Sequence, residues 1–164
     1  MIPVVVMILA VLLVILLVYV AVRYTATNEM EDGILALILN NVNFANIGDA
    51  TGLRGSTTAG SYYLSLHTAD PGEGGSQTTS EVTYTSYGRV ALARDGTKWT
   101  VSGGATGVLS AFPPGTGGSG IATHWGLGTA NAGAGHLHFS GPITPNITTG
   151  SGVTPQLTPS IGAD

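Results

Sequence analysis

The sequence has no cysteine and only five lysine and arginine residues among its 164 positions. The absence of cysteine excludes disulfide bonds and thiolate metal sites. Five basic side chains spread along the chain cannot form the cationic stripe that neutralises nucleic-acid phosphates, so we expect no nucleic-acid partner. Charged residues make up only 9% of the sequence, and the formal net charge is -4. Since soluble domains usually contain about a quarter charged residues, we expect much of the surface to lie in lipid or against other subunits.

Apolar residues dominate the start of the chain. No charged residue interrupts the run from Ile2 to Val22. At about 1.5 Å per residue, a helix of this length spans the ~30 Å hydrocarbon core of a bilayer. The run predicts a transmembrane helix over residues 1–24, or a helix with the same bounds buried in a helical protein bundle. A cleaved signal peptide is disfavoured because no basic residue precedes the run, and the single Arg23 leaves the membrane orientation open.

An amphipathic helix is expected over residues 25–48. Apolar residues recur there every three or four positions, at Met30, Ile34, Leu37, Ile38 and Val42. Asn28 and Glu31 have the spacing of a capping box at the start of this helix. The apolar face could pack on the protein's own β domain or on neighbouring copies. Residues 49–60, rich in Gly, Thr, Ser and Ala, are predicted to form a linker.

The rest of the chain, residues 61–164, predicts a mainly β fold, an antiparallel β-sandwich or barrel. Short stretches of β-branched and aromatic residues alternate with Gly- and Pro-containing turns. Strands are expected at residues 62–67, 82–85, 89–94, 98–102, 108–112, 121–128, 136–141, 143–149 and 153–157. Asp95-Gly96 is a hairpin turn signal, and residues 103–107 are expected to turn the chain again.

Histidines are the first candidates for a binding site. His136 and His138 would share one face of a strand and, with His67 or His124, could bind zinc or nickel. Histidines with hydrogen-bonded structural roles are the ordinary alternative.

Carboxylates are the second set of candidates. Asp70 and Glu73 could ligate calcium, although two carboxylates fall short of its usual six or more oxygens and the Asp-Pro-Gly sequence forms turns. A glycosidase needs two carboxylates about 5–10 Å apart, and nothing in the sequence selects a pair among Asp70, Glu73, Glu81 and Asp95. Arg89 and Arg94 are expected to pair with Glu81 or Asp95 at the surface.

Aromatic residues could offer a surface on which sugars stack, although alternating strand positions favour the core: Tyr62, Tyr63, Tyr84, Tyr87, Trp99 and Trp125. Since no nucleophile stands beside a base in this pattern, we assign no catalytic residue, no cofactor-binding residue, no metal ligand and no cofactor.

Several motifs occur in a fixed order. They are LSLHTADPGE at residues 64–73, TTSEV at 78–82, YGRV at 87–90, KWTV at 98–101, ATHWGLG at 122–128, GPITPNI at 141–147 and GVTP at 152–155. In this order, over about residues 29–157, they resemble a family of small bacteriophage virion structural proteins, described as tail-fibre or head-fibre proteins. The resemblance implies a β-rich, multimeric virion component without enzymatic activity.

The expected function is therefore that of a non-enzymatic bacteriophage virion structural protein, such as a spike, fibre-base or decoration component. Its N-terminal hydrophobic helix would anchor it in a membrane or a helical bundle. A membrane-anchored module that binds host glycans is the alternative. The expected partners are further copies of the chain, with a trimer favoured, other virion proteins, and a lipid bilayer, either a viral internal membrane or the host inner membrane.

Overall fold

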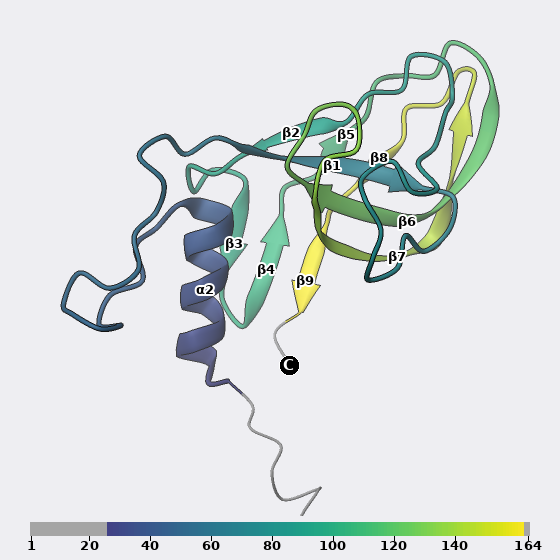
Figure 1. Cartoon of the computed structure of the whole chain (residues 1–164). Helices are drawn as coiled ribbons and strands as arrows, with labels where there is room; N and C mark the ends of the chain where they lie inside the picture. Colours follow the sequence, from purple (N-terminus) through teal and green to yellow (C-terminus); the bar gives the residue numbers. More distant parts are fainter. Residues whose placement is uncertain (1–25, 163–164) are drawn as a thin grey trace, which may run out of the picture.

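The computed structural model describes residues 26–162, and Figure 1 shows their arrangement. The elements are α2 (Asn28–Asn40), β1 (Ser61–His67), β2 (Val90–Ala93), β3 (Trp99–Val101), β4 (Gly104–Gly107), β5 (Ser110–Ala111), β6 (Ser119–Gly128), β7 (Leu137–Gly150), β8 (Gln156–Leu157) and β9 (Ser160–Gly162). The predicted membrane or bundle helix over residues 1–24 lies outside the described residues. Within the described part, no helix is long and apolar enough to cross a bilayer.

Helix α2 is shorter than the sequence predicted. The Thr27 hydroxyl accepts a hydrogen bond from the Met30 amide at 3.4 Å, which makes Thr27, rather than Asn28, the residue that caps the start. At the other end, Asn41 adopts a left-handed backbone with a φ of 57°. A residue in that conformation cannot continue a right-handed helix, so α2 ends at Asn40 instead of extending to residue 48.

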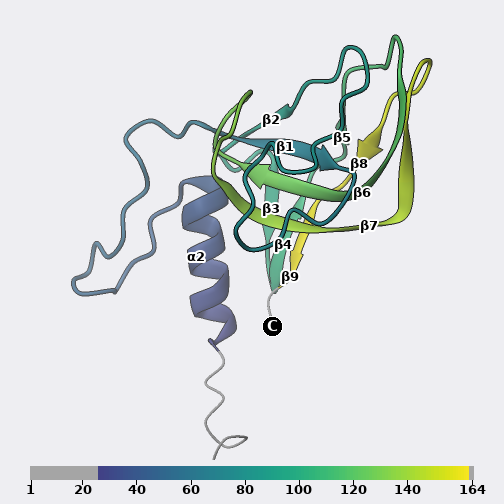
Figure 2. The ribbon, with the colours of Figure 1, turned by 45° about the vertical axis from the view of Figure 1, so that its right-hand side comes forward.

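A four-stranded antiparallel sheet, in the order β2-β1-β6-β7, is the largest β element. Its register places Tyr62 opposite Leu92, and Leu66 opposite Trp125. Figures 1 and 2 show β6 and β7 as a long, curved pair that reaches away from α2. Because side chains alternate between the two faces of a strand, one face of this sheet supplies much of the core.

Two smaller antiparallel sheets complete the domain. One has the order β3-β4-β9, and the other consists of β5 and β8. Helix α2 lies beside the β3-β4-β9 sheet in both ribbon views and contacts β3 and β4. Leu35 and Leu39 of the helix join the core cluster that the strands form. The predicted mainly β, antiparallel character is confirmed, with one short helix in the described residues.

One predicted turn is in fact a strand. Residues 103–107 were expected to turn the chain, but Gly104–Gly107 is β4, the central strand of its sheet. The glycine there allows close packing, since a Cβ atom at Gly107 would lie 2.7 Å from the ring of Pro159. β9 was also missed by the sequence analysis. Asp95-Gly96 does form a turn, but this turn connects β2 to β3. These two strands belong to different sheets and therefore do not form a hairpin.

One predicted strand is absent. Residues 82–85 take part only in an isolated bridge, between Thr85 and Gly117. The residues that flank this stretch, Ser80 and Ser86, have positive φ angles of 53° and 79°. These conformations are incompatible with an extended strand, so the segment between β1 and β2 is a folded loop rather than a strand.

Two charged side chains fasten α2 to the sheets, and Asp32 is the first. Its Oδ1 atom accepts hydrogen bonds from the amides of Gly103 at 2.9 Å and Gly104 at 3.3 Å, in the turn between β3 and β4. The first turn of the helix is thereby held against that hairpin.

Arg94 is the second fastening. It follows β2 directly and donates hydrogen bonds to the carbonyl oxygens of Leu37 at 2.9 Å, of Ile38, and of Ala59 at 2.9 Å. The last carbonyls of a helix lack partners within the helix and carry partial negative charge. The Arg94 guanidinium satisfies them and ties the end of α2 to the edge of the four-stranded sheet. The expected pairing of Arg94 with Glu81 or Asp95 was therefore wrong.

We predict that Arg94→Ala lowers the free energy of unfolding by about 2–4 kcal/mol, because three carbonyl groups lose a charged donor. Urea unfolding followed by tryptophan fluorescence measures this, since both Trp99 and Trp125 are buried. The matched control is Arg54→Ala at an exposed position, for which we expect a change within about 0.5 kcal/mol. Equal effects of the two substitutions would contradict the fastening role of Arg94.

Candidate functional site

A cluster of ionisable side chains lies where the segment between β1 and β2 folds back over β1. Glu81 accepts two hydrogen bonds from Arg89, to Oε1 and to Oε2, each at 2.7 Å. The Tyr87 hydroxyl also donates to Glu81 Oε1, at 2.8 Å. The side chains of Arg89 and Glu81 are 3% and 14% exposed. This is a bidentate, charge-assisted pair shielded from water, an arrangement in which both charges are strongly held.

The remaining N–H groups of Arg89 connect the pair to another part of the chain. Nη1 donates to the carbonyl of Ala130 at 2.9 Å, and Nη2 donates to that of Gly133 at 2.8 Å, in the loop between β6 and β7. Of the two expected partners of Arg89, Glu81 and Asp95, the structure shows Glu81, but the pair is buried and not at the surface. The Glu81 oxygens thus accept three donors, all from the protein itself.

Ser65 and His67 form a second polar cluster, on β1. The Ser65 hydroxyl lies 2.8 Å from Nε2 of His67, and Nδ1 of His67 lies 2.8 Å from the carbonyl of Thr79. Because a carbonyl only accepts, Nδ1 must bear the proton. A serine beside a histidine is the geometry of an activated nucleophile, yet both residues are 0% exposed. A Cβ atom at Gly126 would lie 2.5 Å from Nε2, so the site has no room for a substrate.

The other histidines do not join His67 in a metal site. The rings of His136 and His138 are 6.4 Å apart between centroids, and Nδ1 of His138 lies 2.9 Å from the Tyr62 hydroxyl. Nδ1 of His124 lies 2.9 Å from the hydroxyl of Thr123. Among residues 26–162, no group of three or more His, Asp or Glu side chains could hold a metal ion.

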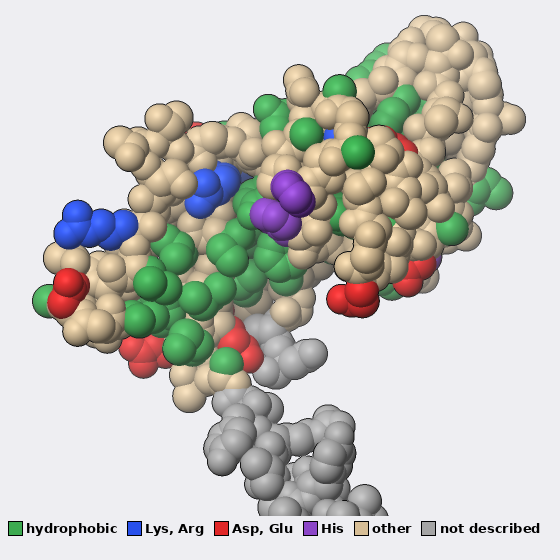
Figure 3. Space-filling view, viewed as in Figure 1, with side chains coloured by type: hydrophobic (Ala, Val, Ile, Leu, Met, Phe, Trp, Pro, Cys, Tyr) green, Lys and Arg blue, Asp and Glu red, His purple; other side chains and the backbone are tan. Residues whose placement is uncertain are grey.

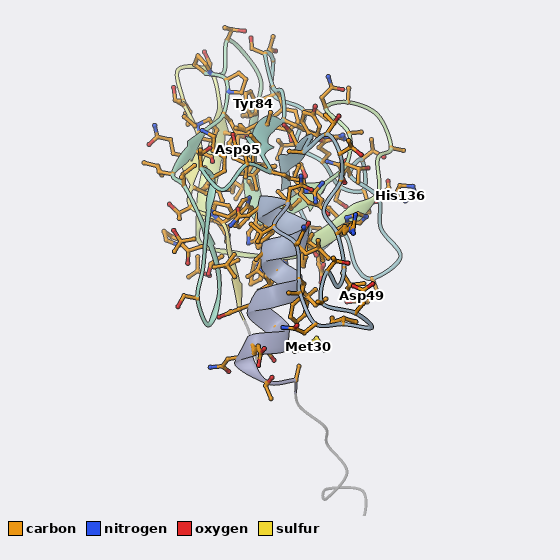
Figure 4. All side chains as sticks on the ribbon, turned by 90° about the vertical axis from the view of Figure 1, so that its left-hand side faces the viewer. Met30, Asp49, Tyr84, Asp95 and His136 are labelled. Carbon is orange, nitrogen blue, oxygen red and sulfur yellow. The ribbon has the colours of Figure 1, made fainter. Side chains whose placement is uncertain are left out.

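The candidate carboxylates lie in separate turns. Asp70 accepts a hydrogen bond from the amide of Gly72 at 2.9 Å, which is the turn-forming role that its sequence predicted. Asp95 accepts from the hydroxyl of Thr97 at 2.6 Å and from its amide at 3.0 Å. These bonds hold the pKa of Asp95 below its ordinary value. A further carboxylate, Asp49, accepts a hydrogen bond from the amide of Thr51 at 2.8 Å. Figure 4 shows that Asp49 and Asp95 lie on loops at different levels of the molecule.

Most of the candidate sugar-stacking residues are in the core. Tyr62, Tyr84, Trp99 and Trp125 are 8%, 4%, 4% and 7% exposed. The alternation of large apolar and polar residues already favoured this placement. The rings of Tyr62, Tyr84 and Trp99 are therefore not available for stacking on a saccharide, whereas Trp125 lines the hollows described next.

A groove beside β7 was not anticipated from the sequence. Two hollows of about 410 and 450 Å³ share Trp125, Pro142 and Ser160 in their walls. Between them they run from β7 to the segment that contains β8 and β9. The pattern in the sequence that could have indicated this groove is the alternation of apolar residues along β7, at Leu137, Phe139, Ile143 and Ile147. Of the residues that the structure describes, Glu73 and His138 are the ionisable ones that line either hollow.

We predict that His67 makes the fold less stable in mild acid. Burial lowers the pKa of His67 below its ordinary value of 6.5. As the pH falls through about 6.5, the unfolded chain takes up a proton before the folded chain does, so the free energy of unfolding decreases until the folded pKa is passed. Melting temperatures between about pH 7.5 and about pH 5.5 measure this slope. His67→Asn should flatten it, whereas exposed His136→Asn should not; equal slopes in both variants would refute the assignment.

The comparison with known proteins identifies the family. Residues 25–160 of the chain match the family described as podophage GP4 fiber I protein gp80. No curated individual protein matches the chain. The matched region contains α2, the strands β1 to β8 and the Glu81–Arg89 pair, and it ends at the first residue of β9. The protein belongs to the podophage GP4 fiber I protein gp80 family.

Proposed function

We propose that the protein is a non-enzymatic structural component of a bacteriophage virion, in which it forms part of a fibre. The observation that carries this proposal is the family match, which extends over residues 25–160 and therefore over nearly the whole described domain. A fibre component needs a domain that keeps its shape, and the buried polar contacts described above serve that purpose.

The roles of the ionisable residues support an absence of catalysis. The buried Glu81 and His67 hold loops against β1, while Asp70 and Asp95 close turns. A general acid or base must instead reach a substrate, and it must exchange protons with that substrate. In the described residues, each of these groups has its hydrogen bonds directed at the protein itself.

The N-terminal run from Ile2 to Val22 lies before the matched region. We propose that it anchors the protein, either in a viral internal membrane or the host inner membrane, or in a bundle of such segments within the particle. An all-apolar stretch of this length needs apolar surroundings. Since Asp32 and Arg94 fasten α2 to the sheets, an anchor that precedes α2 would also orient the β domain.

We predict that phage particles contain the protein, and that deleting residues 1–24 lowers its copy number per particle by more than about tenfold, because the apolar burial that holds it is lost. Quantitative mass spectrometry of purified particles measures this. Tryptophan fluorescence of the truncated chain verifies that the β domain is folded.

The matched control carries a scrambled version of residues 2–22 with the same composition, which should keep the protein in the particle. If particles made by the unaltered phage lack the protein, the proposed virion role fails. If the truncated protein stays in the particle at the normal level, only the anchor fails.

A further inference from the structure

The outer face of α2 is apolar, although it points away from the core. Leu35 and Leu39 are the buried residues of the helix. On the opposite side, Met30, Ile34 and Leu37 follow one another at intervals of four and three residues and so share one face. Met30 is 43% exposed, and Ile34 and Leu37 are partly exposed. A helix that used only its own domain for packing would have polar residues at these positions.

The loop after α2 enlarges this apolar surface. Phe44 and Leu53 exchange backbone hydrogen bonds of 2.9 Å, which makes the loop a narrow hairpin. The Phe44 ring lies against the helix, because a Cβ atom at Gly33 would be 2.7 Å from it. Val42 and Leu53 remain 52% and 40% exposed.

Together these residues form what we call the α2 patch: Met30, Ile34, Leu37, Val42, Phe44 and Leu53. Figure 3 shows hydrophobic side chains gathered over this side of the molecule, and Figure 4 shows Met30 near the start of the helix. None of the six is charged or polar. A contiguous exposed patch of this kind marks an interaction site more often than a free surface.

We propose that the α2 patch binds the α2 patch of a second copy of this chain, with the two helices pointing in the same direction. The position of the N-terminal run decides the partner and the orientation. The run ends at Val22, and α2 begins at Asn28, so only five residues separate them. Copies whose runs enter one apolar environment from the same side turn the same end of α2 toward it, which favours a parallel contact over an antiparallel one.

The absence of charge in the patch fits this orientation. In a parallel contact with twofold symmetry, the residues closest to the symmetry axis approach their own equivalents on the other copy. A charged residue would then face a like charge, at a cost in both repulsion and desolvation. The patch contains none, and its acidic neighbours Glu29 and Glu31 lie outside it. This interface rests on the proposed anchoring of the N-terminal run, but it does not require that the protein be a virion component.

The absence of native cysteine allows a direct test with single-cysteine variants of the full chain. Met30→Cys, Ile34→Cys and Leu37→Cys are each expressed and oxidised in the producing cells, and the membrane fraction is assayed separately for the protein, so that failure of the anchor and failure of the interface are distinguished. Ala132→Cys, at an exposed position in the β6–β7 loop, is the control. Disulfide-linked dimers are then quantified on a non-reducing gel.

In a parallel contact, Met30→Cys and Leu37→Cys each link to their own equivalents, and we expect at least about five times the dimer of the control, because equivalent Cα atoms can approach within about 7 Å. An antiparallel contact centred near Ile34 would separate the two Met30 positions by about 12 Å along the axis, at about 1.5 Å per residue. Dimers from Ile34→Cys alone would therefore overturn the proposal, as would dimers at the control level from all three variants.

Discussion

The bidentate ion pair between Glu81 and Arg89 is the contact on which the shape of the β domain most depends. It holds the long segment between β1 and β2, and Arg89 extends its reach to the carbonyls of the β6–β7 loop. Tyr87 connects the same carboxylate to the backbone of β1, since its hydroxyl also accepts from the amide of Leu66 at 3.1 Å. A buried pair of this kind is costly to break, because removing one partner leaves the other charge without compensation.

The protein has few charged side chains, and several of those in the described residues form hydrogen bonds that hold the fold together. Asp32 and Arg94 position α2 at its two ends, while Asp49 and Asp95 close turns. Two features accompany the scarcity of charge in this chain. The ionic groups named above make contacts inside the protein, and the outer face of α2 is left apolar. Both fit the fibre family to which the chain belongs.

The sequence was sufficient for the features that depend on local patterns. Alternation predicted β1 and the mainly β class, and residue type predicted the partner of Arg89. The sequence did not predict the features that depend on contacts between residues far apart in the chain. Arg94 binds carbonyls of a helix more than fifty residues away in sequence, and Gly104–Gly107 is a strand because it pairs with β3 on one side and with β9 on the other. The left-handed Asn41 shortened the helix. The groove beside Trp125 required the tertiary arrangement of β7 and β9.

The central claim is that the buried ionisable residues hold the β domain in its fold. The free energy of unfolding of Glu81→Gln tests it most directly, with exposed Glu73→Gln as the matched control. Our account predicts a loss of about 3–5 kcal/mol for Glu81→Gln, because Arg89 is left buried without its counter-ion, and a change within about 0.5 kcal/mol for the control. A Glu81→Gln protein as stable as the unaltered chain would contradict the account.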